Sequence, residues 1–283
     1  MPVNTKKKHP VMPRPSGLSR HLLTVFSLMF CSVAFAMSDT SAETVTLSNG
    51  QVIVVNLADT VESPAASRGN DSGNDLIIRL RKGFSLDTEL NEDRLQRQKQ
   101  LLVGKQAYID RILSRAQRHL YLSVSEAERR QLPTELALLP VIESAYDPMA
   151  LSRSQAAGLW QFIPDTGRLY GLEQSWYYDA RRDPLASTQA AYDYLSKLNS
   201  IFNSWELALA AYNAGPGTVS RAIKRNKALG LATDYWSLKL PAETMAYVPR
   251  FLAVAALFKS PDSFNVRMAS IPNRPNYRTV NTP

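Results

Sequence analysis

Cysteine and histidine are nearly absent from this sequence. The 283 residues hold one cysteine, Cys31, and three histidines, of which His9 and His21 lie within the first 36 residues. After residue 36 the chain therefore has no thiol and one imidazole, that of His119. This scarcity excludes disulfides, cysteine nucleophiles and zinc sites built from several Cys and His side chains in that part. A Ser-His-Asp triad would have to use His119 alone.

Acidic residues are absent from the first 36 positions, which hold five of the 33 lysines and arginines. The net charge of +8 for the whole chain suggests nucleic acid as a partner. Without those five charges the net charge falls from +8 to +3. We therefore expect no nucleic-acid binding.

The same segment, residues 1–36, has the organisation of a secretory signal peptide. A basic region ends at Arg20, an apolar run covers residues 22–35, and Ala34-Phe35-Ala36 supplies the small residues needed for cleavage after Ala36. The sequence thus predicts export to the periplasm or cell envelope.

Two alternatives would attach the protein to the membrane. The leader could stay uncleaved, although its apolar run is shorter than the ~20 residues that cross a bilayer. Cys31 could carry a lipid, although Phe30 stands before it, where lipoprotein signals have a small residue. No other segment is apolar enough to span a membrane.

We expect residues 37–90 to form an N-terminal extension or linker. The first half of this segment is rich in Ser, Asp, Asn and Gly and poor in apolar residues. Within it, Asn49-Gly50 separates two β-branched runs over 44–55, a pattern typical of a hairpin with a two-residue turn. An isolated hairpin is only marginally stable, so we expect at most a small β element here.

Residues 91–259 have the pattern of a single mainly α domain, followed by a flexible Pro- and Asn-rich tail over 260–283. Asp183-Pro184 predicts the start of one helix, and Ser204 caps another that Gly215-Pro216-Gly217 ends. A last helix over 242–258 should bend at Pro249. The apolar positions that open this domain are Leu95, Leu101, Leu102, Tyr108, Ile109, Ile112, Leu113, Ala116 and Leu120.

Glu143 follows a strongly apolar helix that we expect between Pro133 and Asp147-Pro148. Apolar side chains cover almost its whole circumference, so the helix is predicted to be buried. Burial raises the pKa of a glutamate, as a general acid requires near neutral pH. The plainer alternative is a glutamate at a helix end that pairs with a basic neighbour such as Arg153.

Four further polar side chains stand at the edges of apolar runs, next to Gly or Pro. They are Gln161, Tyr212, Asn213 and Tyr247. Each alone is more easily read as a satisfied core hydrogen bond. Together with Glu143 they indicate a cleft.

Six segments give the chain a specific family resemblance over about 180 residues. It resembles the lytic transglycosylases with the soluble-transglycosylase domain, which are mainly α with a goose-lysozyme-like fold. The segments are DLIIRLRKGFSL (75–86), LPTELALLPVIESAYDP (132–148), AAGLWQFIPDTGRLYGL (156–172), YDARRDPLASTQAAYDYL (178–195), LALAAYNAGPGTV (207–219) and TDYWSLKLPAETMAYVPR (233–250).

The resemblance implies cleavage of the MurNAc-β-1,4-GlcNAc bond of peptidoglycan without water, leaving 1,6-anhydromuramoyl ends. By matching motif positions, Glu143 is the sole catalytic acid/base and Tyr247 orients it. The resemblance also implies that the substrate-binding residues are Ser152, Gln161, Tyr212, Asn213 and Tyr247. The resemblance implies no metal and no cofactor, peptidoglycan glycan strands as the partner, and we expect a monomer.

Two other functions stay open from the sequence. A water-using muramidase would need a second carboxylate, for which Asp147, Asp165 and Asp179 are candidates. A non-catalytic peptidoglycan-binding protein would keep the fold without the chemistry.

Two residue clusters have plainer interpretations. We expect most of the aromatics around residues 160–178 to be core and one or two to line a groove. We expect the basic helical face of Arg221, Lys224, Arg225 and Lys227 to be solvated, and His119 to be structural.

Overall fold

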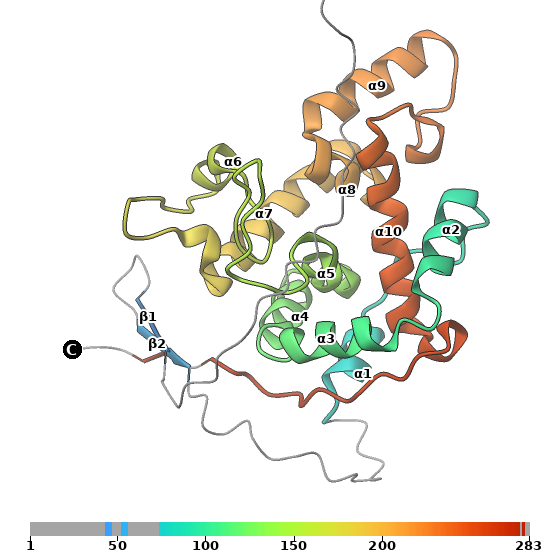
Figure 1. Cartoon of the computed structure of the whole chain (residues 1–283). Helices are drawn as coiled ribbons and strands as arrows, with labels where there is room; N and C mark the ends of the chain where they lie inside the picture. The colour runs from blue at the N-terminus through green and yellow to red at the C-terminus, as the bar shows by residue number, and fades with distance from the viewer. Residues whose placement is uncertain (1–42, 47–51, 56–73, 278, 281–283) are drawn as a thin grey trace, which may run out of the picture. The chain divides into compact units, whose positions relative to one another are not determined.

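The computed structural model describes residues 43–46, 52–55, 74–277 and 279–280 (Figure 1). The chain divides into two units, Met1–Asp39 and Thr40–Pro283, and every described residue belongs to the second. The predicted signal peptide, with Phe30 and Cys31, lies outside the described residues. In this part of the chain, no helix combines the length and the hydropathy that crossing a bilayer would require.

The predicted mainly α class is confirmed. The α-helices are α1 (Leu76–Lys82), α2 (Asp93–Leu102), α3 (Gln106–Ala116), α4 (Leu120–Arg129), α5 (Leu139–Glu143), α6 (Pro164–Leu169), α7 (Pro184–Phe202), α8 (Trp205–Ala214), α9 (Pro216–Ala228) and α10 (Ala242–Lys259). The short 3-10 helices are η2 (Thr134–Leu138), η3 (Ala180–Arg182), η4 (Tyr235–Ser237) and η5 (Pro261–Phe264). Three strands are described: β1 (Glu43–Thr46), β2 (Val52–Val55) and β3 (Thr279–Val280).

The predicted β element is present as an antiparallel sheet in the order β1-β2-β3. Its register differs from the expected one. A two-residue turn at Asn49-Gly50 would pair Val45 with Val54, whereas Val45 pairs with Ile53. The turn itself lies outside the described residues.

The helical core extends beyond the predicted boundaries of 91 and 259. Leu76 and Leu80 of α1 are fully buried, and Ile271 is buried in the segment expected to be a loose tail. The Leu76 amide donates to the Ile271 carbonyl at 2.8 Å, so the two ends of the domain are joined by backbone. Composition alone missed this contact because it links residues far apart in the sequence.

Helix α10 packs against α2 on one side and against α8 and α5 on the other (Figure 1). It is buried along most of its length and continues through Pro249. Proline has no N–H, so the Met245 carbonyl loses its donor within the helix. The Tyr235 hydroxyl of η4 replaces that donor at 3.0 Å. A tertiary hydrogen bond therefore allows a proline in the middle of this helix.

The predicted helix ends near the site are confirmed. Asp183 caps α7 by accepting from the amides of Leu185 and Ala186 at 2.8 and 3.0 Å. Ser204 caps α8 by accepting from the Leu207 amide at 3.3 Å. Gly215, with φ of 81°, ends α8, and Pro216 then begins α9. These caps fix the direction of α8, whose last turn carries Tyr212 and Asn213.

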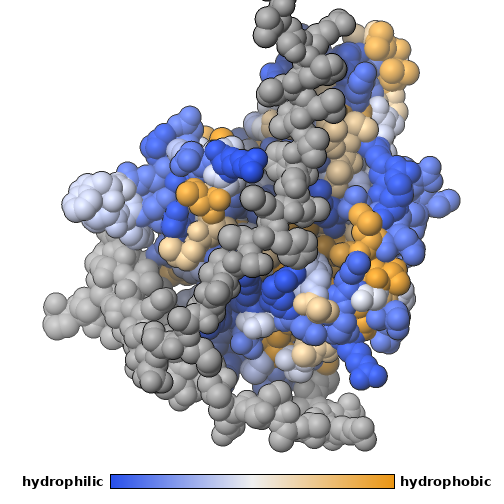
Figure 2. Space-filling view, viewed as in Figure 1, coloured by the Kyte–Doolittle hydropathy of each residue, from blue (hydrophilic) through white to orange (hydrophobic). Residues whose placement is uncertain are grey.

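The described surface on the face in Figure 2 is mostly hydrophilic, with hydrophobic residues in small separate groups. The four basic residues of α9 are exposed, as predicted for a solvated face. Single exposed hydrophobic residues are normal on a folded surface and carry no function by themselves.

Candidate active site

Glu143 is the last residue of α5, whose other residues are mostly buried. The predicted helix between Pro133 and Asp147 is instead η2 followed directly by α5, and it ends four residues before Asp147. Ala145 and Tyr146 end it because both have left-handed φ, 52° and 59°. The buried Tyr146 hydroxyl donates to the Ala137 carbonyl and holds this turn. Because the chain turns back at Ala145 and Tyr146, Glu143 lies at the tip of the apolar helix α5.

The Glu143 carboxylate meets a tyrosine from α10. Tyr247, which is 4% exposed, donates its hydroxyl to Glu143 Oε1. The two residues are 104 positions apart in the sequence, and the predicted orienting role of Tyr247 requires this contact. Tyr212 lies close enough for the Glu143 charge to raise the pKa of its phenol, together with the larger effect of burial.

Burial raises the pKa of the Glu143 carboxyl to about 7. The hydrogen bond from Tyr247 and the positive charge of Arg250 act the other way, and the negative charge of Glu243 adds to the rise. Among the described residues, Glu143 has no ion pair, and the alternative partner Arg153 is exposed. The carboxyl group is therefore suited to hold and release a proton near neutral pH.

Tyr212 and Asn213 lie in the last turn of α8, beside the same site. The Tyr212 hydroxyl donates to the Trp160 carbonyl at 2.8 Å, next to Gln161 in the sequence. Asn213 accepts from the Thr244 hydroxyl of α10 at 2.8 Å. Tyr212 and Asn213 thus join the tip of α8 to the Gln161 loop and to the helix that carries Tyr247.

Gln161 and Ser152 lie on one loop, where each hydrogen bonds to its own neighbours. Gln161 has a φ of 49° and donates its side-chain amide to the carbonyls of Gly158 at 2.9 Å and Ala150 at 3.3 Å. Ser152 Oγ accepts from the Ala156 amide at 2.9 Å. Within the described part of the chain, neither side chain hydrogen bonds to Glu143, so a shared substrate-binding role stays a prediction.

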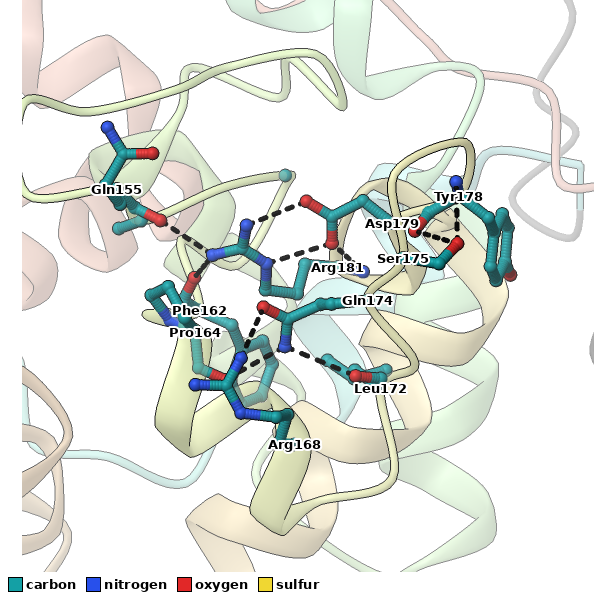
Figure 3. Close-up of polar contacts among 12 residues, drawn as sticks. Gln155, Phe162, Pro164, Arg168, Leu172, Gln174, Ser175, Tyr178, Asp179 and Arg181 are labelled. Atoms are coloured by element: carbon teal, nitrogen blue, oxygen red, sulfur yellow. Dashed lines mark hydrogen bonds and ion pairs between the residues drawn. The ribbon is translucent and has the colours of Figure 1, made fainter.

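Arg181 holds this loop in place, and sequence reasoning missed it (Figure 3). Its buried guanidinium donates to the carbonyls of Gln155 at 2.6 Å and Phe162 at 3.0 Å. It also forms an ion pair with Asp179 at 2.7 Å. A Cβ at Gly158 would lie 1.8 Å from the Arg181 carbonyl oxygen, so only glycine fits there. In the sequence, Arg181 stands two residues before the helix start at Asp183-Pro184, and this position alone does not indicate a buried arginine.

The three aspartates considered as a second catalytic carboxylate have other partners. Asp147 accepts from the Met149 amide at 2.9 Å, and Asp165 pairs with Arg168 at an exposed position. Arg181 lowers the pKa of Asp179 through hydrogen bonds and charge, although burial opposes it. The carboxylate whose charge reaches Glu143 is Glu243, which sequence reasoning also missed. Glu243 precedes Tyr247 by one helical turn, and this spacing could have indicated it.

The aromatic residues divide between core and surface. Trp160 is fully buried and donates its indole N–H to Thr188 at 2.9 Å. In contrast, Trp176 is 94% exposed and Tyr177 is 72% exposed. The rings of Tyr194 and Tyr212 lie 5.3 Å apart, so Tyr212 packs against a second tyrosine, from α7.

His119 is buried and hydrogen bonds through Nδ1 to the Tyr277 hydroxyl, consistent with the structural role expected. Burial lowers its pKa to about 4, so it is neutral at pH 7. Across residues 74–277 and the strands, no three His, Cys, Asp or Glu side chains gather as metal ligands.

Comparison with known proteins supports the motif resemblance. The sequence profile of the Transglycosylase SLT domain matches residues 121–234. Membrane-bound lytic murein transglycosylase D of Escherichia coli K12 is 48% identical over 177 residues, which are 62% of this chain and 39% of that protein. A putative tributyltin chloride resistance protein of Alteromonas sp. strain M-1 is 43% identical over 118 residues, 41% of this chain and 57% of that protein. The chain thus spans about two fifths of the length of the first of these relatives.

Two solved structures also show similarity. The soluble lytic transglycosylase SLT70 of E. coli has a TM-score of 0.40 and 25% identity, covering 50% of this chain and 24% of that one. An inactive mutant of lytic transglycosylase Slt from Pseudomonas aeruginosa has a TM-score of 0.41 and 30% identity, covering 55% and 26%. The resemblance expected from the six motifs is confirmed, and it is strongest over residues 121–234, which match the Transglycosylase SLT domain.

Proposed function

We propose that this protein is a peptidoglycan lytic transglycosylase that cleaves the MurNAc-β-1,4-GlcNAc bond and leaves 1,6-anhydromuramoyl ends. The observation that carries the proposal is Glu143, a carboxyl group with a pKa of about 7, hydrogen bonded to Tyr247 at the end of a buried helix. The name of a similar protein, membrane-bound lytic murein transglycosylase D of E. coli, supports the substrate class.

The proposed reaction needs one protein carboxylate. Protonated Glu143 donates its proton to the glycosidic oxygen as the bond from that oxygen to the muramoyl anomeric carbon breaks. The carbonyl oxygen of the neighbouring N-acetyl group supports the positive charge that develops on this carbon. Ionised Glu143 then takes the proton of the muramoyl 6-hydroxyl, whose oxygen bonds to the anomeric carbon. The glutamate ends protonated, and water does not enter the products.

The remaining residues have positioning and binding roles in this proposal. Tyr247 holds one carboxylate oxygen, which keeps the other free for the glycosidic bond. Tyr212 fixes the backbone at Trp160 and thereby the loop of Gln161. Gln161, Asn213 and Ser152 bind sugar groups through their amides and hydroxyl. The roles of all six residues rest on the motif match together with these contacts.

We also propose an envelope location, because residues 1–36 have the features of a signal peptide. The same segment would be the means of any membrane attachment, either as an uncleaved leader or through a lipid on Cys31. The catalytic domain then faces the wall as a monomer, and glycan strands are its partner.

Mass spectrometry of peptidoglycan digested by the purified protein tests the reaction. An anhydromuramoyl product is lighter than the hydrolysed product by one water molecule. We expect every muramoyl end newly formed by cleavage to be an anhydro end. Reducing ends without anhydro ends would contradict the proposal.

One observation is compatible with the muramidase alternative, namely a second carboxylate whose charge acts on Glu143. An inverting hydrolase places a second carboxylate roughly 6.5–9.5 Å from the acid to activate water, and the charge of Glu243 reaches Glu143. In a muramidase, Glu243→Gln would abolish the formation of reducing ends. In a lytic transglycosylase the same variant still produces anhydro ends. A non-catalytic binding protein would release no fragment in either form.

A further inference from the structure

We propose that Thr244 is a positioning residue that fixes the orientation of the Asn213 side chain, so that its NH₂ group faces the substrate. The inference rests on the proposed function and deepens it. The group that Asn213 would recognise is a carbonyl oxygen, such as that of an N-acetyl sugar. Thr244 itself is 1% exposed, which leaves its side chain no surface for contact with a ligand.

The hydrogen bond between the two side chains determines which end of the amide is presented. Thr244 Oγ1 donates to Asn213 Oδ1 at 2.8 Å. A primary amide carries its acceptor and its two donors on opposite sides, so holding the oxygen directs the nitrogen away from Thr244. Asn213 is half-buried at the tip of α8, and among the described residues its amide nitrogen has no hydrogen-bond partner and is not among the buried unpaired atoms.

Thr244 cannot easily shift, because its backbone is held from a second side. The Tyr235 hydroxyl lies 3.0 Å from the carbonyl oxygens of both Thr244 and Met245, and its one proton is shared between them. Pro249 leaves the Met245 carbonyl without a helical donor, so this bond also satisfies a group that would otherwise be unpaired. The first turn of α10 is thereby fixed to η4.

The position of Thr244 in the helix explains why its hydroxyl is free for Asn213. A helical threonine commonly donates to the carbonyl four residues earlier. For Thr244 that residue is Leu240, which precedes the start of α10 at Ala242. Thr244 and Tyr247 are three residues apart and share a face of the helix. One helical turn therefore positions both the acid, through Tyr247, and the amide, through Thr244.

A binding cycle tests this role without depending on the chemistry. The parent is the full chain with Glu143→Gln, and the probe is a tetramer of N-acetylglucosamine measured by titration calorimetry. Thr244→Val removes the donor at nearly constant volume. We expect it to weaken binding by about fivefold to tenfold, in keeping with the loss of one oriented hydrogen bond. In an Asn213→Ala background the same change should alter binding less than about twofold, because the amide it orients is gone.

Two further variants separate positioning from general damage. Thr244→Ser keeps the hydroxyl and should restore binding to within about twofold of the parent. Thr134→Val is a matched control, because Thr134 is also 1% exposed and its hydroxyl donates to the Leu80 carbonyl at 2.6 Å. It should lower the melting temperature without changing the affinity.

Three results would overturn the proposal. They are an equal loss from Thr244→Val in both backgrounds, a serine variant that stays as weak as the valine variant, and a parent that does not bind the tetramer. The identity of the cleavage product is measured separately on the wild type. A muramidase product would therefore reject the proposed function and leave the Thr244 result standing.

Discussion

Two carboxylates of this domain have opposite surroundings, Glu143 beside α10 and Asp179 before η3. Burial raises the pKa of Glu143 to about 7, and the hydroxyl of Tyr247 is its hydrogen-bond partner. Asp179 is also partly buried, yet the guanidinium of Arg181 lowers its pKa. Both are acidic side chains in the same domain, and only the second has a cationic partner in contact.

The difference indicates what each carboxylate can do. A carboxylate held ionised by an arginine is a poor proton donor at neutral pH, but it anchors a loop. A carboxyl group in an apolar site with one tyrosine can exist in both protonation states near pH 7. The partner of the carboxylate, rather than its burial alone, therefore distinguishes Glu143, the proposed acid, from Asp179, which anchors a loop.

Replacing Glu143 by Gln should produce the largest effect on activity. The variant keeps the size and an acceptor for Tyr247 but cannot transfer the proton. We expect the rate of peptidoglycan solubilisation to fall by roughly 10³-fold, within the range for loss of an acid/base group. Unchanged clearing of a peptidoglycan suspension would refute the catalytic role. Asp179→Asn, by comparison, should leave residual activity in proportion to the folded fraction.

Replacing Arg181 by Met should produce the largest effect on stability. The change leaves Asp179 without its cation and the carbonyls of Gln155 and Phe162 without donors. Breaking a buried pair in this way costs about 3–5 kcal/mol of unfolding free energy. Urea denaturation measures it, with the exposed Arg153→Met as a control expected to change by less than about 0.5 kcal/mol. A loss below about 1 kcal/mol would show that the loop does not depend on Arg181.

The Glu143→Gln variant should also be more stable than the wild type, but only at high pH. The pKa of Glu143 is raised in the folded protein, so the wild type loses stability as pH rises from about 4.5 through about 7. Gln does not ionise, and the variant should gain about 2–3 kcal/mol at pH 8 and nothing at pH 4. Denaturation curves at the two pH values test this. A gain of equal size at both would show that ionisation is not the cause.

Replacing Tyr235 by Phe should have the smallest effect, at the start of α10. It removes the donor to the carbonyls of Thr244 and Met245, at a cost of about 1–2 kcal/mol. Thermal unfolding measures the loss, and the exposed Tyr177→Phe should show almost none. If Tyr235→Phe and Tyr177→Phe have the same melting temperature, the hydrogen bond from Tyr235 is not what allows Pro249 within α10.

The sequence allowed the local features of the site to be predicted. Leu136, Leu138 and Leu139 ahead of Glu143 indicate a buried element, and they are fully buried. Asp183 and Ser204 predict where α7 and α8 begin, because helix capping depends only on residues close in the sequence.

Features that depend on distant partners could not be predicted in the same way. The lowered pKa of Asp179 depends on the geometry of Arg181, which contacts residues from 155 to 179. The contact between Tyr247 and Glu143 spans 104 residues and was expected only through the family resemblance. The left-handed turn at Ala145 and Tyr146 shortened the predicted helix, although neither residue type favours that conformation.

The pKa of Glu143 itself is the most direct test of this account. Carbon-13 NMR of glutamate-labelled protein follows each side-chain carboxyl through a pH titration, and the resonance missing from Glu143→Gln identifies the residue. We predict a midpoint of about 7, raised by burial against the opposing effect of Tyr247. A midpoint at or below the ordinary value of about 4.3 would contradict the central claim. It would mean that Glu143 is an ionised structural carboxylate like Asp179.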